Sequence, residues 1–157
     1  LRSADRELRT PRSSPSARRI PHAVFIRRAR GYTPAPIALP AAGPSVLATG
    51  GYLKNTACLT RSVGGRGEAL LSQHIGDLDN AASCEALEKA VEHLQRVLEL
   101  RPQAIAHDLH PDFFSTQLAQ RLAAELGVPA IGVQHHHAHI AALCAEHGVT
   151  GPVLGLA

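Results

Sequence analysis

The sequence predicts an α/β fold built on a mixed β-sheet. Short apolar segments separated by glycine-rich turns fill residues 45–74, which is the pattern of an antiparallel meander. Beyond residue 80, stretches with a helical repeat of apolar side chains alternate with short apolar runs, as in the crossover units of a parallel sheet. Three antiparallel strands followed by crossover units are typical of a sheet of the ribonuclease-H type.

The meander is expected to contain strands over residues 45–49, 57–61 and 68–74. Glycines mark the two connections between these strands, at residues 50–56 and 64–67. Glycine is favoured in tight turns because it adopts positive φ without a steric penalty. We therefore expect two consecutive hairpins at the start of the folded region.

Two helices with apolar stripes follow the meander. The first is predicted over about residues 83–100, where leucines and a valine recur at helical spacing. The second is predicted over about residues 115–126, and Gly127 stands at its expected C-cap. The remaining predicted elements are a strand at 104–107, a buried strand at 128–133, a helix that begins near His135, and a final apolar strand at 153–157.

The first part of the chain differs in composition from the rest. Residues 1–30 contain nine Arg and only two acidic residues, a net charge of +7, whereas the remaining residues carry a net charge of −4. Residues 1–20 are not expected to fold, and residues 22–26 form a possible strand. Four prolines in residues 34–44 indicate a linker that forms neither helix nor ladder. We therefore divide the chain into residues 1–43 and 44–157.

Composition limits the classes of function. A basic arm can bind nucleic acid, but aromatic residues make up only 3% of the chain and no recognition helix follows, so nucleic-acid binding is not expected. No run of eighteen apolar residues occurs, so no membrane span is expected. The three cysteines are widely spaced and odd in number, as in a reduced cytoplasmic protein.

Four histidines lie within residues 135–139, where a strand is followed by a helix. His135 and His139 are four residues apart and would lie on one helix face, a spacing that allows both imidazoles to bind one divalent ion. An acidic third ligand would have to come from elsewhere. The alternative is that these histidines are ordinary polar residues at a strand end.

Two further segments hold candidate site residues. The turn at residues 50–56 combines flexible glycines with one lysine and one hydroxyl, the parts of a phosphate cradle, although an ordinary hairpin turn would look the same. The loop after the strand at 104–107 is polar, and sheet topology could bring it beside the histidine run. The candidates are Gly50, Gly51, Lys54 and Thr56 in the turn, and His107, Asp108 and His110 in the loop.

Several blocks of sequence together resemble the HypF family, the carbamoyltransferases of [NiFe]-hydrogenase maturation. The blocks occur in the family's order and lie at residues 27–32, 53–56, 71–78, 106–112, 115–116 and 133–140. The resemblance implies that residues 27–32 end a YrdC-like domain. It further implies that residues 44–157 are the first lobe of a TsaD-like domain, which has an actin-like, duplicated ribonuclease-H fold.

The resemblance also implies an activity. Proteins of this family use carbamoyl phosphate and ATP to form a carbamoyl adenylate, and pass the carbamoyl group to the C-terminal cysteine of HypE for cyanide ligand synthesis. Carried over by motif, His135 and His139 would bind a divalent metal, zinc or iron. The turn at residues 50–56 would contact the phosphates of ATP.

One feature qualifies the resemblance. The chain stops before the glycine-rich, Asp-containing loop that should supply an acidic metal ligand and much of the ATP site. We therefore expect a fragment that is inactive alone, with the third metal ligand beyond Ala157. The alternatives are a TsaD-like enzyme that transfers threonylcarbamoyl to tRNA, against which the triple-histidine run argues, and a non-catalytic metal-binding module.

Overall fold

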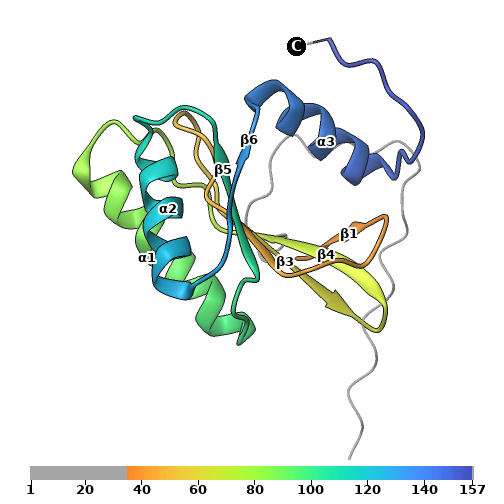
Figure 1. The fold of residues 1–157 in the computed structure, drawn as a ribbon, viewed down its shortest axis with the longest axis horizontal. Coiled ribbons are helices and arrows are strands. Elements are labelled where there is room, and N and C mark those ends of the chain that lie inside the picture. The colour runs from red at the N-terminus through yellow and green to blue at the C-terminus, as the bar shows by residue number, and fades with distance from the viewer. Residues whose placement is uncertain (1–34, 157) are drawn as a thin grey trace, which may run out of the picture.

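Six strands and three helices form the part of the chain that the computed structural model describes, residues 35–156 (Figure 1). The helices are α1 (Ala81–Leu98), α2 (Phe114–Leu126) and α3 (His135–His147). The strands are β1 (Ile37–Leu39), β2 (Val46–Ala48), β3 (Cys58–Val63), β4 (Arg66–Leu71), β5 (Ala104–Asp108) and β6 (Ala130–Val133).

All six strands belong to one mixed sheet in the order β1-β4-β3-β2-β5-β6. The pairs β1–β4, β4–β3 and β3–β2 are antiparallel, whereas β2–β5 and β5–β6 are parallel. The meander therefore occupies one half of the sheet, and the crossover strands extend it on the other side of β2. This arrangement confirms the predicted mixed sheet of the ribonuclease-H type.

The β3–β4 hairpin shows how local sequence sets the register. Gly64 and Gly65 have φ values of 57° and 78° and form a two-residue turn, the geometry that suits the twist of paired strands. The turn is shorter than predicted, because Arg66 already belongs to β4. Across the ladder, Nε of Arg61 lies 2.9 Å from Oε2 of Glu68, its register partner.

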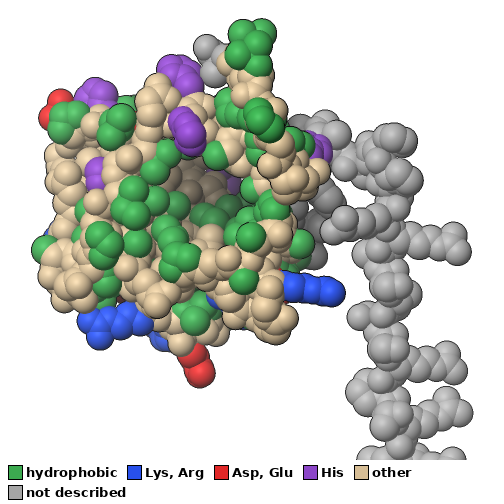
Figure 2. Space-filling model, turned by 45° about the vertical axis from the view of Figure 1, so that its right-hand side comes forward, with side chains coloured by type: hydrophobic (Ala, Val, Ile, Leu, Met, Phe, Trp, Pro, Cys, Tyr) green, Lys and Arg blue, Asp and Glu red, His purple; other side chains and the backbone are tan. Residues whose placement is uncertain are grey.

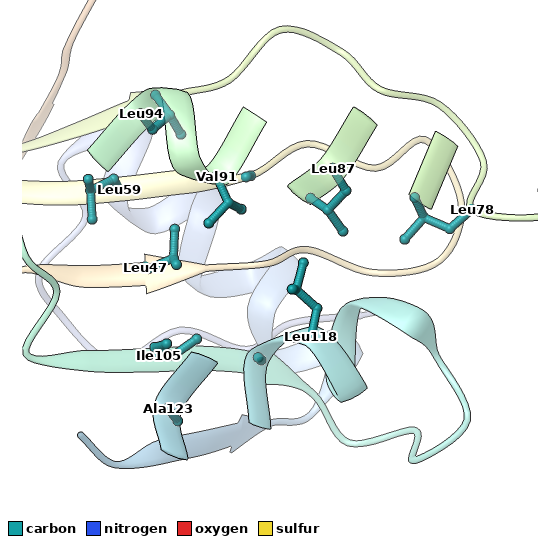
Figure 3. Packing of buried hydrophobic residues seen from close by; sticks show 11 residues of the cluster. Leu47, Leu59, Leu78, Leu87, Val91, Leu94, Ile105, Leu118 and Ala123 are labelled. Carbon is teal, nitrogen blue, oxygen red and sulfur yellow. The ribbon is translucent and has the colours of Figure 1, made fainter. Parts of the chain in front are cut away.

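The hydrophobic core lies between the sheet and the layer formed by α1 and α2 (Figure 1). Figure 3 shows Leu87, Val91 and Leu94 on α1 beside Leu47 and Leu59 on the neighbouring strands. All five side chains are at most 5% exposed. Each fully buried leucine stabilises the fold by about 1.5–3 kcal/mol relative to exposure. The stripe that predicted α1 is therefore its core face.

The opposite side of the sheet is covered differently. There α3 is the only helix among the described residues (Figure 1), and none of its residues is buried. The expectation of a buried strand at residues 128–133 is wrong, because Ala130, Ile131 and Gly132 are exposed. The physical reason is position, since β6 is the last strand in the sheet order and, among the described strands, pairs only with β5.

Two further expectations fail. Residues 37–39 form a strand inside the predicted linker, because Pro36 and Pro40 flank β1 and leave its own N–H groups free to pair with β4. The final strand at 153–157 is not formed over residues 153–156, where Leu154 is 92% exposed.

The predictions for residues 1–34 lie outside the described part of the chain, and so does Ala157. Within residues 35–156, none of the helices has the length and apolar character needed to cross a bilayer.

Candidate metal and phosphate site

The candidate site lies at the edge of the sheet where β2, β5 and β6 end. These strands are parallel, and the register pairs Ala48 with Ala106 and Asp108 with Val133. The carboxyl ends of parallel strands meet at one edge, so the segments that follow them meet there too. The loop after β5 and the histidine run do come together, because Nδ1 of His135 lies 2.8 Å from Oδ2 of Asp108.

The histidine pair occupies the first turns of α3. The helix begins at His135, and the side chain of the preceding Gln134 caps it by accepting a hydrogen bond from the N–H of His137 at 2.8 Å. The four-residue spacing brings Nε2 of His135 to 3.1 Å from Nε2 of His139. The two histidines that the sequence suggested as metal ligands therefore face each other through their Nε2 atoms.

This geometry fits two ligands of one ion. Two nitrogens bound to a tetrahedral ion at about 2.0–2.1 Å lie roughly 3.3 Å apart, close to the 3.1 Å between His135 and His139. Within residues 35–156, no group of three or more His, Cys, Asp or Glu side chains is arranged to hold a metal ion. The pair could supply two ligands of an open site, in which a metal would act as a Lewis acid.

Asp108 is held from two sides. Its Oδ1 accepts the backbone N–H of His110 at 3.0 Å, and its Oδ2 faces His135. Burial raises the pKa of Asp108, but the hydrogen bonds from His135 and from backbone N–H groups, with the charge of His135, outweigh burial and hold the pKa below its usual value. The carboxylate therefore stays ionised beside the histidine.

The glycine loop, residues 50–56, lies beside the histidine pair. A Cβ atom built on Gly51 would be 3.6 Å from Cε1 of His135. Gly50 has a φ of +75°, and a Cβ atom there would be 2.7 Å from the backbone oxygen of Thr56. Only glycine suits such a position without strain, so the loop conformation depends on Gly50.

Asn55 fixes the loop from inside. Its side-chain amide donates to the carbonyl oxygens of Thr49 and Gly51 at 2.9 and 2.7 Å, and its backbone forms a bridge with Gly76. The backbone N–H groups of residues 50–53 have no hydrogen-bond partner within the described residues. Consecutive unpaired N–H groups in a loop suit an anion. Asn55 was missed as a site residue, although asparagine is a typical turn residue whose side chain bonds to nearby backbone groups.

Lys54 and Thr56, the other predicted phosphate ligands, lie in the same loop. Lys54 has a φ of 49°, its backbone N–H donates to Oδ1 of Asp77 at 2.7 Å, and the residue is exposed. Thr56 is half-buried. Both line the pocket that the histidine pair also lines. All four predicted loop residues are thus in one place.

His107 and His110 line the pocket but do not join the histidine pair. Nδ1 of His107 donates to the backbone oxygen of Asp108 at 2.6 Å. His110 stacks on Phe113 with ring centroids 4.2 Å apart, and Phe113 stacks on Tyr52 at 5.4 Å. Tyr52 and Phe113 were missed as site residues. The sequence feature that could have drawn attention to them is the rarity of aromatic residues, since the chain has only two Tyr and three Phe.

These residues surround a pocket of about 1050 Å³ with a largely apolar wall. Figure 2 shows a hollowed face of the molecule with hydrophobic side chains around the hollow and histidines near it. Polar groups from the glycine loop, β5 and α3 line the pocket. An apolar pocket with a few convergent polar groups is the usual form of a ligand site.

The fold and the geometry together define a class of protein, a ribonuclease-H-like lobe that carries a pair of facing histidines beside a glycine loop. Comparison with known families makes the assignment specific. The family described as the HypF Kae1-like domain matches residues 41–146. The chain therefore belongs to the HypF family.

Named relatives agree with this assignment. The chain is 68% identical over 137 residues to carbamoyltransferase HypF2 of Cupriavidus necator, an alignment that covers 87% of this chain and 16% of the relative. It is 33% identical over 126 residues to a probable carbamoyltransferase HypF of Methanocaldococcus jannaschii, covering 79% of this chain and 16% of the relative. The chain thus spans about a sixth of the length of these relatives.

Solved structures give the same result. Full-length HypF in a phosphate- and nucleotide-bound form superposes with a TM-score of 0.70 and 44% identity, covering 80% of this chain and 16% of that one. HypF of T. kodakarensis superposes with a TM-score of 0.71 and 36% identity, covering 79% of this chain and 16% of that one. The fold is therefore that of the matching part of HypF.

Proposed function

We propose that this chain provides the metal-binding and phosphate-contacting lobe of a HypF-type carbamoyltransferase. His135 and His139 hold a divalent ion, zinc or iron, and the glycine loop contacts a phosphate of ATP. The main support for the proposal is that Nε2 of His135 and Nε2 of His139 face each other at 3.1 Å, and that Gly51 lies against the ring of His135.

The proposed overall reaction is that of the whole enzyme. A carbamoyl group derived from carbamoyl phosphate, which loses its phosphate, is activated with ATP as a carbamoyl adenylate with release of pyrophosphate. It is then transferred to the C-terminal cysteine of a HypE-like acceptor protein. In the transfer, a bond from the carbamoyl carbon to the cysteine sulfur forms, the bond to AMP breaks, and the thiol loses its proton. The names of the relatives support carbamoyl transfer.

The proposed location is the cytoplasm. The acceptor cysteine has to remain a thiol for the transfer, and thiols persist in reducing compartments. The three cysteines of this chain are free in the structure, which supports the same location.

Metal binding by the purified chain is the first test. Isothermal titration with Zn(II) and anaerobic Fe(II) should show one site, and His135→Ala and His139→Ala should each weaken it at least about tenfold. His137→Ala is the matched control, because it lies in the same exposed helical turn outside the pair. Equal binding by the wild type and the double variant would remove the metal assignment.

A chimaera tests the reaction. This chain replaces its matching segment in HypF2 of Cupriavidus necator, and ATP-dependent carbamoyl transfer to the acceptor protein is measured. The chimaera should be active, and His135→Ala or His139→Ala within it should abolish transfer while His137→Ala should not. A folded chimaera whose activity survives loss of both histidines would contradict the proposed function.

The alternative is a non-catalytic metal-binding module, in which the histidine pair holds an ion and takes no part in the transfer. A chimaera that binds metal at the pair but transfers carbamoyl equally well without it would support that alternative.

A further inference from the structure

We propose that Asp108 is a positioning residue for His135. Its carboxylate fixes the imidazole in the tautomer that carries the proton on Nδ1, and so leaves the lone pair of Nε2 directed toward His139. The inference deepens the proposed function and rests on it, because it assigns a role to a residue that does not itself bind the ion.

The backbone anchors the carboxylate independently of its contact with the histidine. Oδ1 of Asp108 accepts the N–H of His110 at 3.0 Å, and the backbone oxygen of Asp108 accepts the hydroxyl of Thr116 at 3.1 Å. The side chain is only 10% exposed, whereas that of His135 is 52% exposed. The buried, anchored partner therefore orients the exposed one.

The contact between the two side chains determines the tautomer. An ionised carboxylate only accepts hydrogen bonds, so Nδ1 of His135, 2.8 Å from Oδ2, carries the proton. In a neutral imidazole the other nitrogen then has a free lone pair. That atom is Nε2, which faces His139 at 3.1 Å. A metal ion thus finds His135 already in the binding tautomer.

The same reasoning gives His139 the opposite tautomer without metal. Because Nε2 of His135 accepts, Nε2 of His139 donates across the 3.1 Å contact and carries its own proton. Metal binding therefore requires a tautomer change at His139 but none at His135. His136 provides an internal reference, because its Nδ1 accepts from the side-chain N–H of Gln134 at 2.8 Å and its proton is on Nε2.

The test is ¹⁵N NMR of the histidine side chains in the metal-free chain, at a pH where the rings are neutral. Single substitutions to glutamine assign the signals. We expect the proton on Nδ1 in His135 and on Nε2 in His136 and His139. A wild-type His135 with its proton on Nε2 would overturn the inference.

Asp108→Asn is the decisive variant. Its amide oxygen should stay at the Oδ1 position, because the N–H of His110 needs an acceptor there. Its NH₂ group would then face Nδ1 of His135 and force the proton onto Nε2. We expect the tautomer to reverse and affinity for Zn(II) to fall about 10–100-fold, with a smaller loss in Asp108→Ala. A purely structural role predicts the reverse order, since asparagine preserves the shape.

Asp112→Asn is the matched control, an exposed carboxylate in the same loop whose loss should change neither readout. Different results would contradict the role of Asp108 and the proposed function. An unchanged His135 tautomer in folded Asp108→Asn would overturn the inference. A reversed tautomer in that variant, with a wild type that binds no Zn(II), would support the inference and contradict the proposed function. If Asp108→Asn does not fold, the tautomer of His135 in the wild type alone tests the inference.

Discussion

Gly51 lies against the imidazole of His135, so that a Cβ atom on the glycine would be 3.6 Å from Cε1 of the ring. The two residues are far apart in the sequence and meet because β2 and β6 both run parallel to β5. The glycine loop and the histidine pair therefore lie side by side, and a side chain added at Gly51 would contact His135.

The two neighbouring glycines of the loop should respond differently to alanine. In Gly50→Ala the new Cβ would be 2.7 Å from the oxygen of Thr56 at a φ of +75°, so we expect a loss of about 1–3 kcal/mol in the free energy of unfolding. In Gly51→Ala the Cβ meets only ordinary contacts, and we expect a change within about 0.5 kcal/mol. Urea unfolding measures both. Equal losses would mean that the loop adopts another conformation.

The core face of α1 should dominate stability. Leu87 is fully buried, and Leu87→Ala should lower the free energy of unfolding by about 2–5 kcal/mol, because it removes apolar contacts and leaves a cavity. Leu143 on α3 is 54% exposed, so Leu143→Ala is the matched control. It should change the free energy of unfolding by less than about 0.5 kcal/mol. Comparable losses in urea unfolding would show that α3 packs as tightly as α1.

The C-terminus of α1 offers a stabilising substitution. Glu99 caps the helix with a φ of 51°, a left-handed conformation that glycine adopts more easily. We expect Glu99→Gly to raise the free energy of unfolding by about 0.5–1 kcal/mol. Gly127→Ala at the cap of α2, with a φ of 66°, is the reciprocal test and should lower it by a similar amount. A destabilised Glu99→Gly would show that the glutamate side chain matters more than its backbone.

Local patterns in the sequence predicted the features that depend on neighbouring residues. The apolar stripe located α1 to within two residues at each end, and the four-residue spacing placed His135 beside His139. Both predictions follow from the periodicity of the α-helix, which can be read from the spacing of residues in the sequence. The metal role of the pair stays a prediction.

Features that depend on register or on sheet position could not be predicted in the same way. The contact of Asp108 with His135 requires the pairing of β5 with β6, and no local pattern encodes that pairing. Exposure of Ile131 follows from the edge position of β6, whereas its apolar sequence suggested burial. Proline density obscured β1, although three residues with free N–H groups suffice for an edge strand.

Cys58 should give the chain a pH-dependent stability. Burial raises the pKa of its thiol to about 11, and a backbone hydrogen bond from Leu70 only partly offsets this. In the unfolded chain the thiol ionises at its ordinary value, about 8.5. Above that pH the unfolded state binds fewer protons than the folded state, so the free energy of unfolding falls as pH rises.

The contribution of Cys58 is therefore fully present below about pH 8.5 and is lost as the pH rises through about 11. We expect a loss of about 3 kcal/mol over this range, at about 1.4 kcal/mol for each pKa unit. The measurement is urea unfolding of the wild type and of Cys58→Ala at several pH values. Tyrosines and lysines titrate in both proteins, so the difference between them isolates the thiol. A difference that does not change with pH would mean that the folded state exposes Cys58 to solvent, because only a buried thiol favours its neutral form.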